Sequence, residues 1–368
     1  MPNYKIFISA GDLSGEIHAS NLIKEIKKMS PSYFVSCAGG SNLKAVCDSF
    51  IEDIVNINAF GFLPIKQVFY LKKVFKKIKK YFLENRPDKI ILVDYYGFHI
   101  HVARLAKSLG IPIYYYISPQ VWASRSSRIK ELAKVVKKMF VIFPFEEKLY
   151  KDSGVDVVFV GNPLIDKIPQ KTNFQKQGFD TSNPPVIGLF PGSRQNAIKR
   201  HTPILLETAK ILKEQINAKF IMFGVSNKTD FVLPNYVTFD GSSSIDKRTS
   251  IDFAICPSGT ICLENALMGI PMAIIYKLSY FNYFFIRAVI KVKYIGIINI
   301  LSGRTIVPEF IQFNAKPKKI ALSALDQLKQ EKYILKAQEL LSFRQMLGAP
   351  GVSKRVAELI VQDALSNR

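Results

Sequence analysis

Two turns in the second half of the chain contain residue types that bind phosphate. Residues 191–194 (PGSR) follow the apolar run 186–190, and residues 257–260 (PSGT) follow the apolar run 253–256. Free backbone N–H groups and the positive end of a helix dipole meet where a buried strand turns into a helix. Arg194 adds a planar guanidinium suited to a diphosphate. Together the turns predict a diphosphate held without a metal ion, although either turn alone could be an ordinary strand–helix connection.

A carboxylate ends an apolar run in the first half of the chain. Asp94 follows residues 89–93 and is expected to project from the carboxyl edge of a sheet. There it can act as a general base on an acceptor hydroxyl, provided that the two groups come within hydrogen-bond reach. An aspartate that caps the next helix is an equal alternative from these residues alone.

Two further loops contain residues that can contact a sugar. In the loop AGDLSGE, at 10–16, small residues let a ligand approach the backbone, and Asp12 and Glu16 can bind sugar hydroxyls or favour the next helix. Its two glycines do not form the dinucleotide fingerprint GxGxxG. The loop SPQVWA, at 118–123, contains the one tryptophan, Trp122, a residue type that more often packs than binds. The four histidines are too scattered for a metal site, so neither a metal nor a cofactor is expected.

Apolar runs alternate with helical patterns along the chain, which indicates an α/β fold. Several runs are continuously apolar, as parallel strands covered on both faces are. The expected strands are 5–9, 89–93, 113–117, 139–143, 157–160, 186–190, 220–223, 253–256 and 272–276. The polar segment 166–185 is typical of an interdomain linker. It divides the chain into two Rossmann-like halves facing a central cleft, an architecture of many nucleotide-sugar glycosyltransferases.

The composition indicates an ordered protein with an anionic partner. The 368 residues are 48% hydrophobic and 22% charged, and 51 Lys and Arg against 29 Asp and Glu give a net charge of +22. Such a charge favours nucleic acid or an anionic membrane as partner, with Lys-rich codon usage as the alternative. Four cysteines without a CxxC pair fit a reducing compartment. Basic residues interrupt the most apolar region, 271–301, so we expect a cytoplasmic protein that touches a membrane without crossing it.

Residues 68–82 predict a basic amphipathic helix, with apolar residues along one face and six lysines over much of the rest. Such a helix can lie on an anionic bilayer, where each basic residue adds about 1 kcal/mol. An ordinary helix that packs its apolar stripe in the core is the alternative. The aromatic and basic segment 278–293 is a second candidate. The residues expected at the membrane are Val68, Leu71, Lys72, Phe75, Lys76, Ile78, Lys79 and Phe82.

Taken together, these segments resemble glycosyltransferase family 19, the lipid-A-disaccharide synthases. The matching blocks run in order over nearly the whole chain: AGDLSGE at 10–16, AFGF at 59–62, SPQVWA at 118–123, FPFEEKLY at 143–150, VGNPLID at 160–166, FPGSR at 190–194, SGTICLENALMGIPM at 258–272 and NILSGRTIVPEFIQ at 299–312. The resemblance implies a GT-B fold. An acceptor and membrane-facing domain at 1–170 would be completed by a helix at 345–368, and a UDP-sugar-binding domain would span 171–344.

The resemblance implies an inverting transfer in lipid A and lipopolysaccharide biosynthesis of a Gram-negative bacterium. UDP-2,3-diacylglucosamine would be the donor and 2,3-diacylglucosamine 1-phosphate the acceptor. The products would be the β-1′,6-linked disaccharide 1-phosphate and UDP, formed on the cytoplasmic face of the inner membrane. Asp94 matches the family's essential aspartate, the implied base on the acceptor 6-hydroxyl. Arg194 matches its essential arginine, which would stabilise the UDP leaving group.

The same resemblance implies the remaining contacts. Glu264 would bind the ribose hydroxyls. The other donor contacts would be Gly192, Ser193, Ser258, Gly259, Thr260, Asn299, Glu309 and Gln312. The acceptor or sugar contacts would be Gly11, Asp12, Ser14, Gly15, Glu16, Ser118 and Trp122.

The chain departs from the family pattern at Gly97, His99, Asn162 and Ala197. These departures leave the implied base and the phosphate arginine in place and concern the acceptor contacts. Two other functions stay open: another GT-B UDP-sugar transferase acting on a membrane lipid, of the muramyl-lipid N-acetylglucosaminyltransferase type, and a basic nucleic-acid-binding protein. Against the latter, no DNA- or RNA-binding module is recognisable. The pattern leaves both a monomer and a homodimer open.

Overall fold

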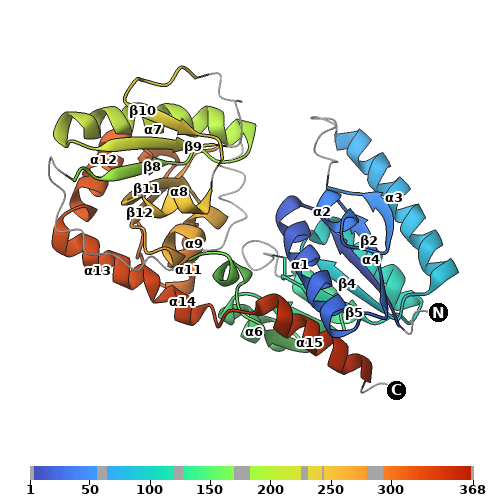
Figure 1. Ribbon diagram of the computed structural model, residues 1–368. Helices are drawn as coiled ribbons and strands as arrows, with labels where there is room; N and C mark the ends of the chain where they lie inside the picture. The colour runs from blue at the N-terminus through green and yellow to red at the C-terminus, as the bar shows by residue number, and fades with distance from the viewer. Residues whose placement is uncertain are drawn as a thin grey trace. The chain divides into compact units, whose positions relative to one another are not determined.

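The computed structural model describes residues 4–55, 64–119, 127–169, 183–224, 231–242, 244–279 and 293–365. The chain forms two compact units, which we call unit 1 (residues 1–166 and 347–368) and unit 2 (residues 167–346). Each unit is a parallel sheet with helices on it, shown in Figure 1. The division lies near the boundary expected after residue 170, and the C-terminal helix belongs to unit 1.

Unit 1 contains, among the described residues, a seven-stranded sheet in the order β3-β2-β1-β4-β5-β6-β7. Its strands are β1 (Tyr4–Ala10), β2 (Tyr33–Gly39), β3 (Ser49–Asp53), β4 (Lys89–Val93), β5 (Ile113–Tyr116), β6 (Lys138–Val141) and β7 (Val157–Phe159). Its helices are α1 (Leu13–Met29), α2 (Ser41–Lys44), α3 (Pro64–Asn85), α4 (Tyr96–Ser108), α5 (Ser127–Val135), α6 (Pro144–Lys151), the 3₁₀ turn η3 (Pro163–Asp166) and α15 (Val352–Leu365).

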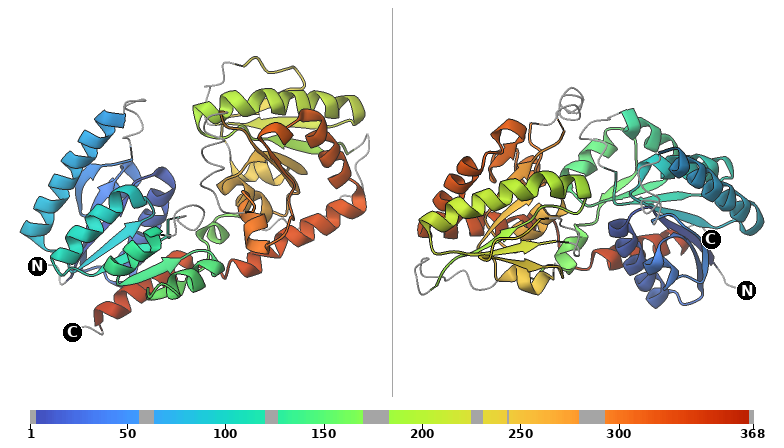
Figure 2. Two further views of the ribbon diagram at one scale, coloured as in Figure 1. Left: turned by 180° about the vertical axis from the view of Figure 1, so that it is seen from behind. Right: turned by 90° about the horizontal axis from the view of Figure 1, so that it is seen from above.

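Alternate side chains of the central strands bury themselves under different helices. Phe7, Ile90 and Leu92 pack with α3 and α4, whereas Ile8 and Ile91 pack with α1 and α15. Figure 2 shows α1 and α15 on one side of this sheet and α3 on the other. Both faces of β1 and β4 are therefore covered, which explains their continuously apolar sequences.

Unit 2 contains, within the described ranges, a six-stranded sheet in the order β10-β9-β8-β11-β12-β13. Its strands are β8 (Val186–Leu189), β9 (Lys219–Phe223), β10 (Val237–Asp240), β11 (Phe253–Pro257), β12 (Met272–Tyr276) and β13 (Glu309–Ile311). Its helices are α7 (Gln195–Gln215), α8 (Ile245–Thr249), α9 (Thr260–Leu267), α11 (Ile297–Ser302), the 3₁₀ turn η4 (Gln312–Asn314), α12 (Pro317–Gln327), α13 (Gln330–Leu341) and α14 (Phe343–Met346).

A buried lysine ties α15 to the sheet of unit 1. Lys89 begins β4 and is 1% exposed. Its ammonium donates to the carbonyl of Ile360 at 2.7 Å and lies 3.2 Å from a carboxylate oxygen of Asp363. Burial lowers the pKa of Lys89, and the Asp363 carboxylate opposes that effect. Because a buried charge is tolerated only with partners, α15 is part of the structure of unit 1 rather than an appendage.

Helix α3 packs its apolar stripe into the core. Ile78 and Phe82 are 0% and 1% exposed, so the expectation that these two side chains contact a membrane is wrong. Leu71 and Phe75 are partly buried against the same core. The periodicity arises from packing in unit 1, as an ordinary amphipathic helix requires. No helix in the described part of the chain is long and apolar enough to span a bilayer.

The first turns of α3 nevertheless keep apolar side chains in solvent. Val68 and Phe69 are 51% and 67% exposed. The exposed Lys72 follows them, with its ammonium 5.9 Å from the centre of the Phe69 ring, and Lys76 and Lys79 are exposed further along the helix. Val68 and Phe69 therefore form an exposed apolar surface of unit 1 beside a row of lysine ammonium groups. We call this surface the tip of α3.

Candidate active site

Asp94 lies at the carboxyl end of β4 in a backbone conformation that few non-glycine residues adopt. Asp94 and Tyr95 have φ angles of 49° and 53°. The Asp94 N–H donates to the carbonyls of Tyr116 and Ile117, both at 3.3 Å, at the end of the neighbouring β5. Left-handed residues of this kind persist where surrounding contacts determine them, and they cluster at functional sites.

The carbonyl of Asp94 is held by two side chains whose role the sequence pattern does not reveal. It accepts hydrogen bonds from Nδ1 of His99 at 2.7 Å and from the hydroxyl of Tyr115. Since Nδ1 donates, Nε2 of His99 accepts from the Ser9 hydroxyl at 3.0 Å. Burial lowers the pKa of the fully buried His99 to about 4, which keeps this neutral tautomer at physiological pH. The histidine at this departure from the family pattern therefore braces Asp94.

The Asp94 carboxyl group is a weaker acid than an ordinary aspartate. Burial and, secondarily, the Asp12 carboxylate raise its pKa to about 6, although a hydrogen bond from the Tyr95 N–H at 2.7 Å opposes the rise. The group is ionised at neutral pH and takes up a proton more readily than a solvated aspartate does. Both properties suit a general base.

The loop at 10–16 lies beside Asp94. Asp12 caps α1 by accepting from the Gly15 N–H at 2.7 Å. A Cβ atom at Gly11 would lie 2.0 Å from a ring carbon of Tyr95, so only glycine fits there. Ser14 is exposed in the first turn of α1. The structure thus brings Gly11, Asp12 and Gly15 into the surroundings of the Asp94–Tyr95 turn.

Two expected sugar contacts have other partners in the structure. Glu16 is 1% exposed and accepts from the Leu43 N–H at 3.0 Å, so it holds the start of α2. Ser118 is 3% exposed and donates to Glu146 at 2.6 Å, which links the SPQVWA and FPFEEKLY blocks. Trp122 lies outside the described residues. The structure therefore supplies no solvent-accessible polar group at Glu16 or Ser118.

In unit 2 the two phosphate-type turns are neighbours. The strands that precede them, β8 and β11, pair directly. A Cβ atom at Gly192 would lie 3.7 Å from the Pro257 ring, and Gly192 has φ 107°, which favours glycine. Ser193 and Arg194 are exposed at the start of α7, and Gly259 and Thr260 are exposed at the start of α9. Two helix N-termini and one guanidinium therefore gather at one edge of the sheet.

Glu264 is paired with an arginine that the sequence pattern did not reveal. Arg248, in α8, is 5% exposed and forms an ion pair with the Glu264 carboxylate. A buried guanidinium normally needs such a partner. Because this contact spans 16 positions and depends on how α8 packs against α9, no local motif predicts it.

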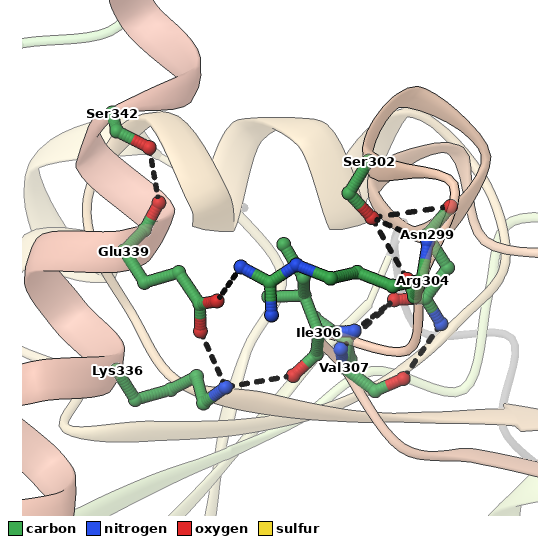
Figure 3. Close-up of polar contacts among 8 residues, drawn as sticks. All are labelled: Asn299, Ser302, Arg304, Ile306, Val307, Lys336, Glu339 and Ser342. Atoms are coloured by element: carbon green, nitrogen blue, oxygen red, sulfur yellow. Dashed lines mark hydrogen bonds and ion pairs between the residues drawn. The ribbon is translucent and has the colours of Figure 1, made fainter.

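The block at 299–312 is a buried support for the second phosphate turn. Asn299 is 0% exposed and binds the backbone of Ile306 and Val307 through both ends of its amide, as Figure 3 shows. Its amide also donates to Glu309, whose carboxylate accepts from the N–H groups of residues 295 and 296. The carbonyl of residue 295 in turn accepts from the Ser258 hydroxyl at 2.5 Å.

The network occupies the side chains of Asn299 and Glu309. Their polar atoms are engaged within the protein, where they hold the backbone segment whose carbonyl accepts from Ser258. Figure 3 also shows Glu339 of α13 between Arg304 and Lys336, with Lys336 donating to the carbonyl of Ile306. The block is therefore fixed to α13 as well. Within the described ranges, no cluster of His, Cys, Asp and Glu side chains is suited to hold a metal ion.

Sequence comparisons find relatives over nearly the whole chain. The family model described as lipid-A-disaccharide synthetase matches residues 6–362. The chain is 36% identical over 375 residues to the lipid-A-disaccharide synthase of Geobacter metallireducens, covering 98% of this chain and 97% of the relative. It is 40% identical over 332 residues to lipid-A-disaccharide synthase 1 of Legionella pneumophila, covering 85% of each.

Solved structures show the same fold at low sequence identity. MurG of Acinetobacter baumannii matches with a TM-score of 0.60 and 16% identity, covering 98% of this chain and 100% of that one. The calicheamicin glycosyltransferase CalG4 matches with a TM-score of 0.63 and 11% identity, covering 97% and 98%. The expected two-domain α/β fold of the GT-B type is confirmed.

Proposed function

Since this chain belongs to the lipid-A-disaccharide synthetase family, we propose which of its residues carry out the reaction. The protein is a UDP-sugar-dependent glycosyltransferase of lipid A biosynthesis. Its donor in this proposal is UDP-2,3-diacylglucosamine and its acceptor is 2,3-diacylglucosamine 1-phosphate. The muramyl-lipid and nucleic-acid alternatives are not favoured by the family match.

Asp94 is the general base in this proposal. Its carboxylate takes the proton of the acceptor 6-hydroxyl while that oxygen attacks C1 of the donor sugar. The C1–O bond to UDP breaks on the opposite face, so the configuration inverts and UDP leaves with the electron pair. The observation that carries this assignment is the strained, braced position of Asp94 together with its pKa of about 6. Gly11, Asp12, Ser14 and Gly15 form the adjacent wall for the acceptor sugar.

Unit 2 binds the donor in this proposal. The exposed turns with Gly192, Ser193, Gly259 and Thr260 provide N–H and hydroxyl donors for the diphosphate, and Arg194 balances the charge that develops on leaving UDP. Glu264, oriented by Arg248, accepts hydrogen bonds from the ribose. Ser258, Asn299, Glu309 and Gln312 support these turns from within.

The tip of α3 is the membrane contact in this proposal. Val68 and Phe69 enter the interface of an anionic bilayer, and Lys72, Lys76 and Lys79 face its head groups. This surface replaces the longer stripe expected from the sequence. In this proposal the enzyme works on the cytoplasmic face of the inner membrane, where its acylated substrates would reside.

The test is UDP release by wild type and Asp94→Asn with both diacylated substrates in detergent micelles. We expect acceptor-dependent release that falls at least about a hundredfold in the variant. The exposed Asp152, in the same unit, supplies the control Asp152→Asn. Release unaffected by Asp94→Asn would remove Asp94 as the base. Release only with other lipid acceptors would contradict the proposed substrates.

A further inference from the structure

Lys277 lies just past β12, beside the second phosphate turn. Strands β11 and β12 pair in parallel with Pro257 opposite Ile275. Gly259 and Lys277 each follow this pair by two residues along the chain. The residue is only partly exposed. Its backbone therefore leaves the sheet at the edge where the diphosphate turns gather.

Two buried side chains fix the backbone at Lys277. Its N–H donates to Nε2 of His201 at 3.1 Å, and Nδ1 of His201 donates to the carbonyl of Pro191 at 2.9 Å. The next residue, Leu278, donates to Gln312 at 3.0 Å and accepts from it at 3.2 Å. His201 and Gln312 are 2% and 3% exposed. One imidazole thus connects the PGSR turn directly to the Lys277 backbone.

Gln312 holds Leu278 from a backbone conformation that costs free energy. Gln312 has φ 50°, in the left-handed region that non-glycine residues seldom adopt. Its amide reaches both backbone groups of Leu278 from that conformation. Strain of this kind is retained where the position it fixes has a use.

The charge of Lys277 is available to a ligand. No carboxylate within the described ranges forms an ion pair with its ammonium. Burial lowers the pKa of His201, and the charges of Arg200 and Lys277 add to that effect, so the imidazole stays neutral beside the ammonium. A lysine whose backbone leaves the sheet at the edge with two helix N-termini is suited to bind an anion there.

We propose that Lys277 is a further ligand of the donor diphosphate, held in place by His201 and Gln312. This inference rests on the proposed donor site. The Lys277 ammonium donates to phosphate oxygens as a compact charge and complements the planar guanidinium of Arg194. Its interaction strengthens as the C1–O bond breaks, because negative charge then moves onto the leaving diphosphate.

Calorimetric titration with uridine, UMP and UDP tests the assignment. In Lys277→Met we expect UDP affinity to fall about 10–100-fold, with uridine affinity unchanged, because only the phosphates lose a charged partner. Lys277→Arg should retain most of the affinity. Lys210→Met, an exposed lysine of α7 away from the sheet edge, removes the same charge and should bind as wild type does.

The outcomes separate this inference from the proposed donor site. If Arg194→Met weakens UDP binding and Lys277→Met does not, the inference fails and the donor site stands. If neither variant changes UDP affinity, the donor site itself is wrong. Equal losses for uridine and UDP in Lys277→Met would show a general disturbance of unit 2 and overturn the phosphate contact.

The positioning role has its own readout. His201→Leu should weaken UDP but not uridine, and Lys277→Met should cost less in that background than in wild type, because the two changes share one contact. His201→Gln, which can still donate and accept, should recover part of the loss. Additive losses in the double variant, or equal losses for uridine, would contradict a role that acts through Lys277.

Discussion

Asp94→Asn is expected to stabilise unit 1 while it removes activity. Folding raises the pKa of Asp94 from an ordinary 3.8 to about 6, chiefly through burial. The folded state therefore prefers the protonated group, and stability is lost as pH rises through that range. The loss amounts to about 2–3 kcal/mol above pH 6, since one pKa unit corresponds to about 1.4 kcal/mol.

An amide at this position avoids the penalty. Asparagine is uncharged at every pH and keeps an oxygen that can accept from the Tyr95 N–H. The variant should therefore exceed wild type by about 2–3 kcal/mol at pH 8 and by almost nothing at pH 4. For a unit of this size, the expected gain in melting temperature at pH 8 is about 4–12 °C.

Urea unfolding followed by fluorescence measures the difference. Curves at several pH values between 4 and 8 should be compared for wild type, Asp94→Asn and the exposed control Asp152→Asn. A variant that is no more stable than wild type at pH 8 would refute the reasoning. So would a gain of the same size at pH 4, because it could not come from the charge of Asp94.

Four further outcomes are expected. In wild type, kcat/KM should fall as pH drops below about 6, where Asp94 takes up a proton. Gly11→Ala should reduce activity and cost about 1–3 kcal/mol, since its Cβ would clash with Tyr95. Asp363→Ala should cost about 2–3 kcal/mol by leaving Lys89 without its carboxylate, and adding Lys89→Met should recover most of that. Phe69→Ser should weaken sedimentation with anionic vesicles and leave activity in detergent unchanged.

For the pH profile, Gly11→Ala and Phe69→Ser, a specific result would contradict the expectation. A kcat/KM that does not change between pH 5 and 7 would show that protonation of Asp94 does not control the rate. Wild-type stability in Gly11→Ala would mean that the Tyr95 ring moves freely. For the membrane surface, Leu83→Ser is the matched control, because Leu83 is 60% exposed at the other end of α3. Equal vesicle binding by Phe69→Ser and Leu83→Ser would place the contact elsewhere.

The strand ends and turns of this protein are readable from its sequence. Continuous apolar runs followed by small residues predict β4, β8 and β11, and the residues after those strands are Asp94 and the two phosphate-type turns. Strands β2, β3, β10 and β13 are not predicted. The run of β2 contains Ser36 and small side chains, β3 is only half-buried, and β13 is three residues long. Their pairing with neighbours, not their composition, makes them strands.

The contacts between distant positions are not readable in the same way. Ser9 beside His99, Arg248 beside Glu264 and His201 behind Lys277 each depend on how elements pack. The apolar stripe of α3 is equally compatible with a core and a bilayer, because both require the same period. For that reason the sequence pattern predicts Ile78 and Phe82 at the membrane, whereas the structure buries both in the core.

Unit 1 is assembled from two parts of the chain, with the whole of unit 2 between them. On the ribosome, residues 167–346 can therefore finish folding while unit 1 still lacks α15. During that interval Lys89 has neither Ile360 nor Asp363 as partner, and the face of the sheet that α15 covers is open to solvent. We expect nascent chains stalled before residue 352 to bind chaperones at unit 1. Synthesis of α15 would then release them.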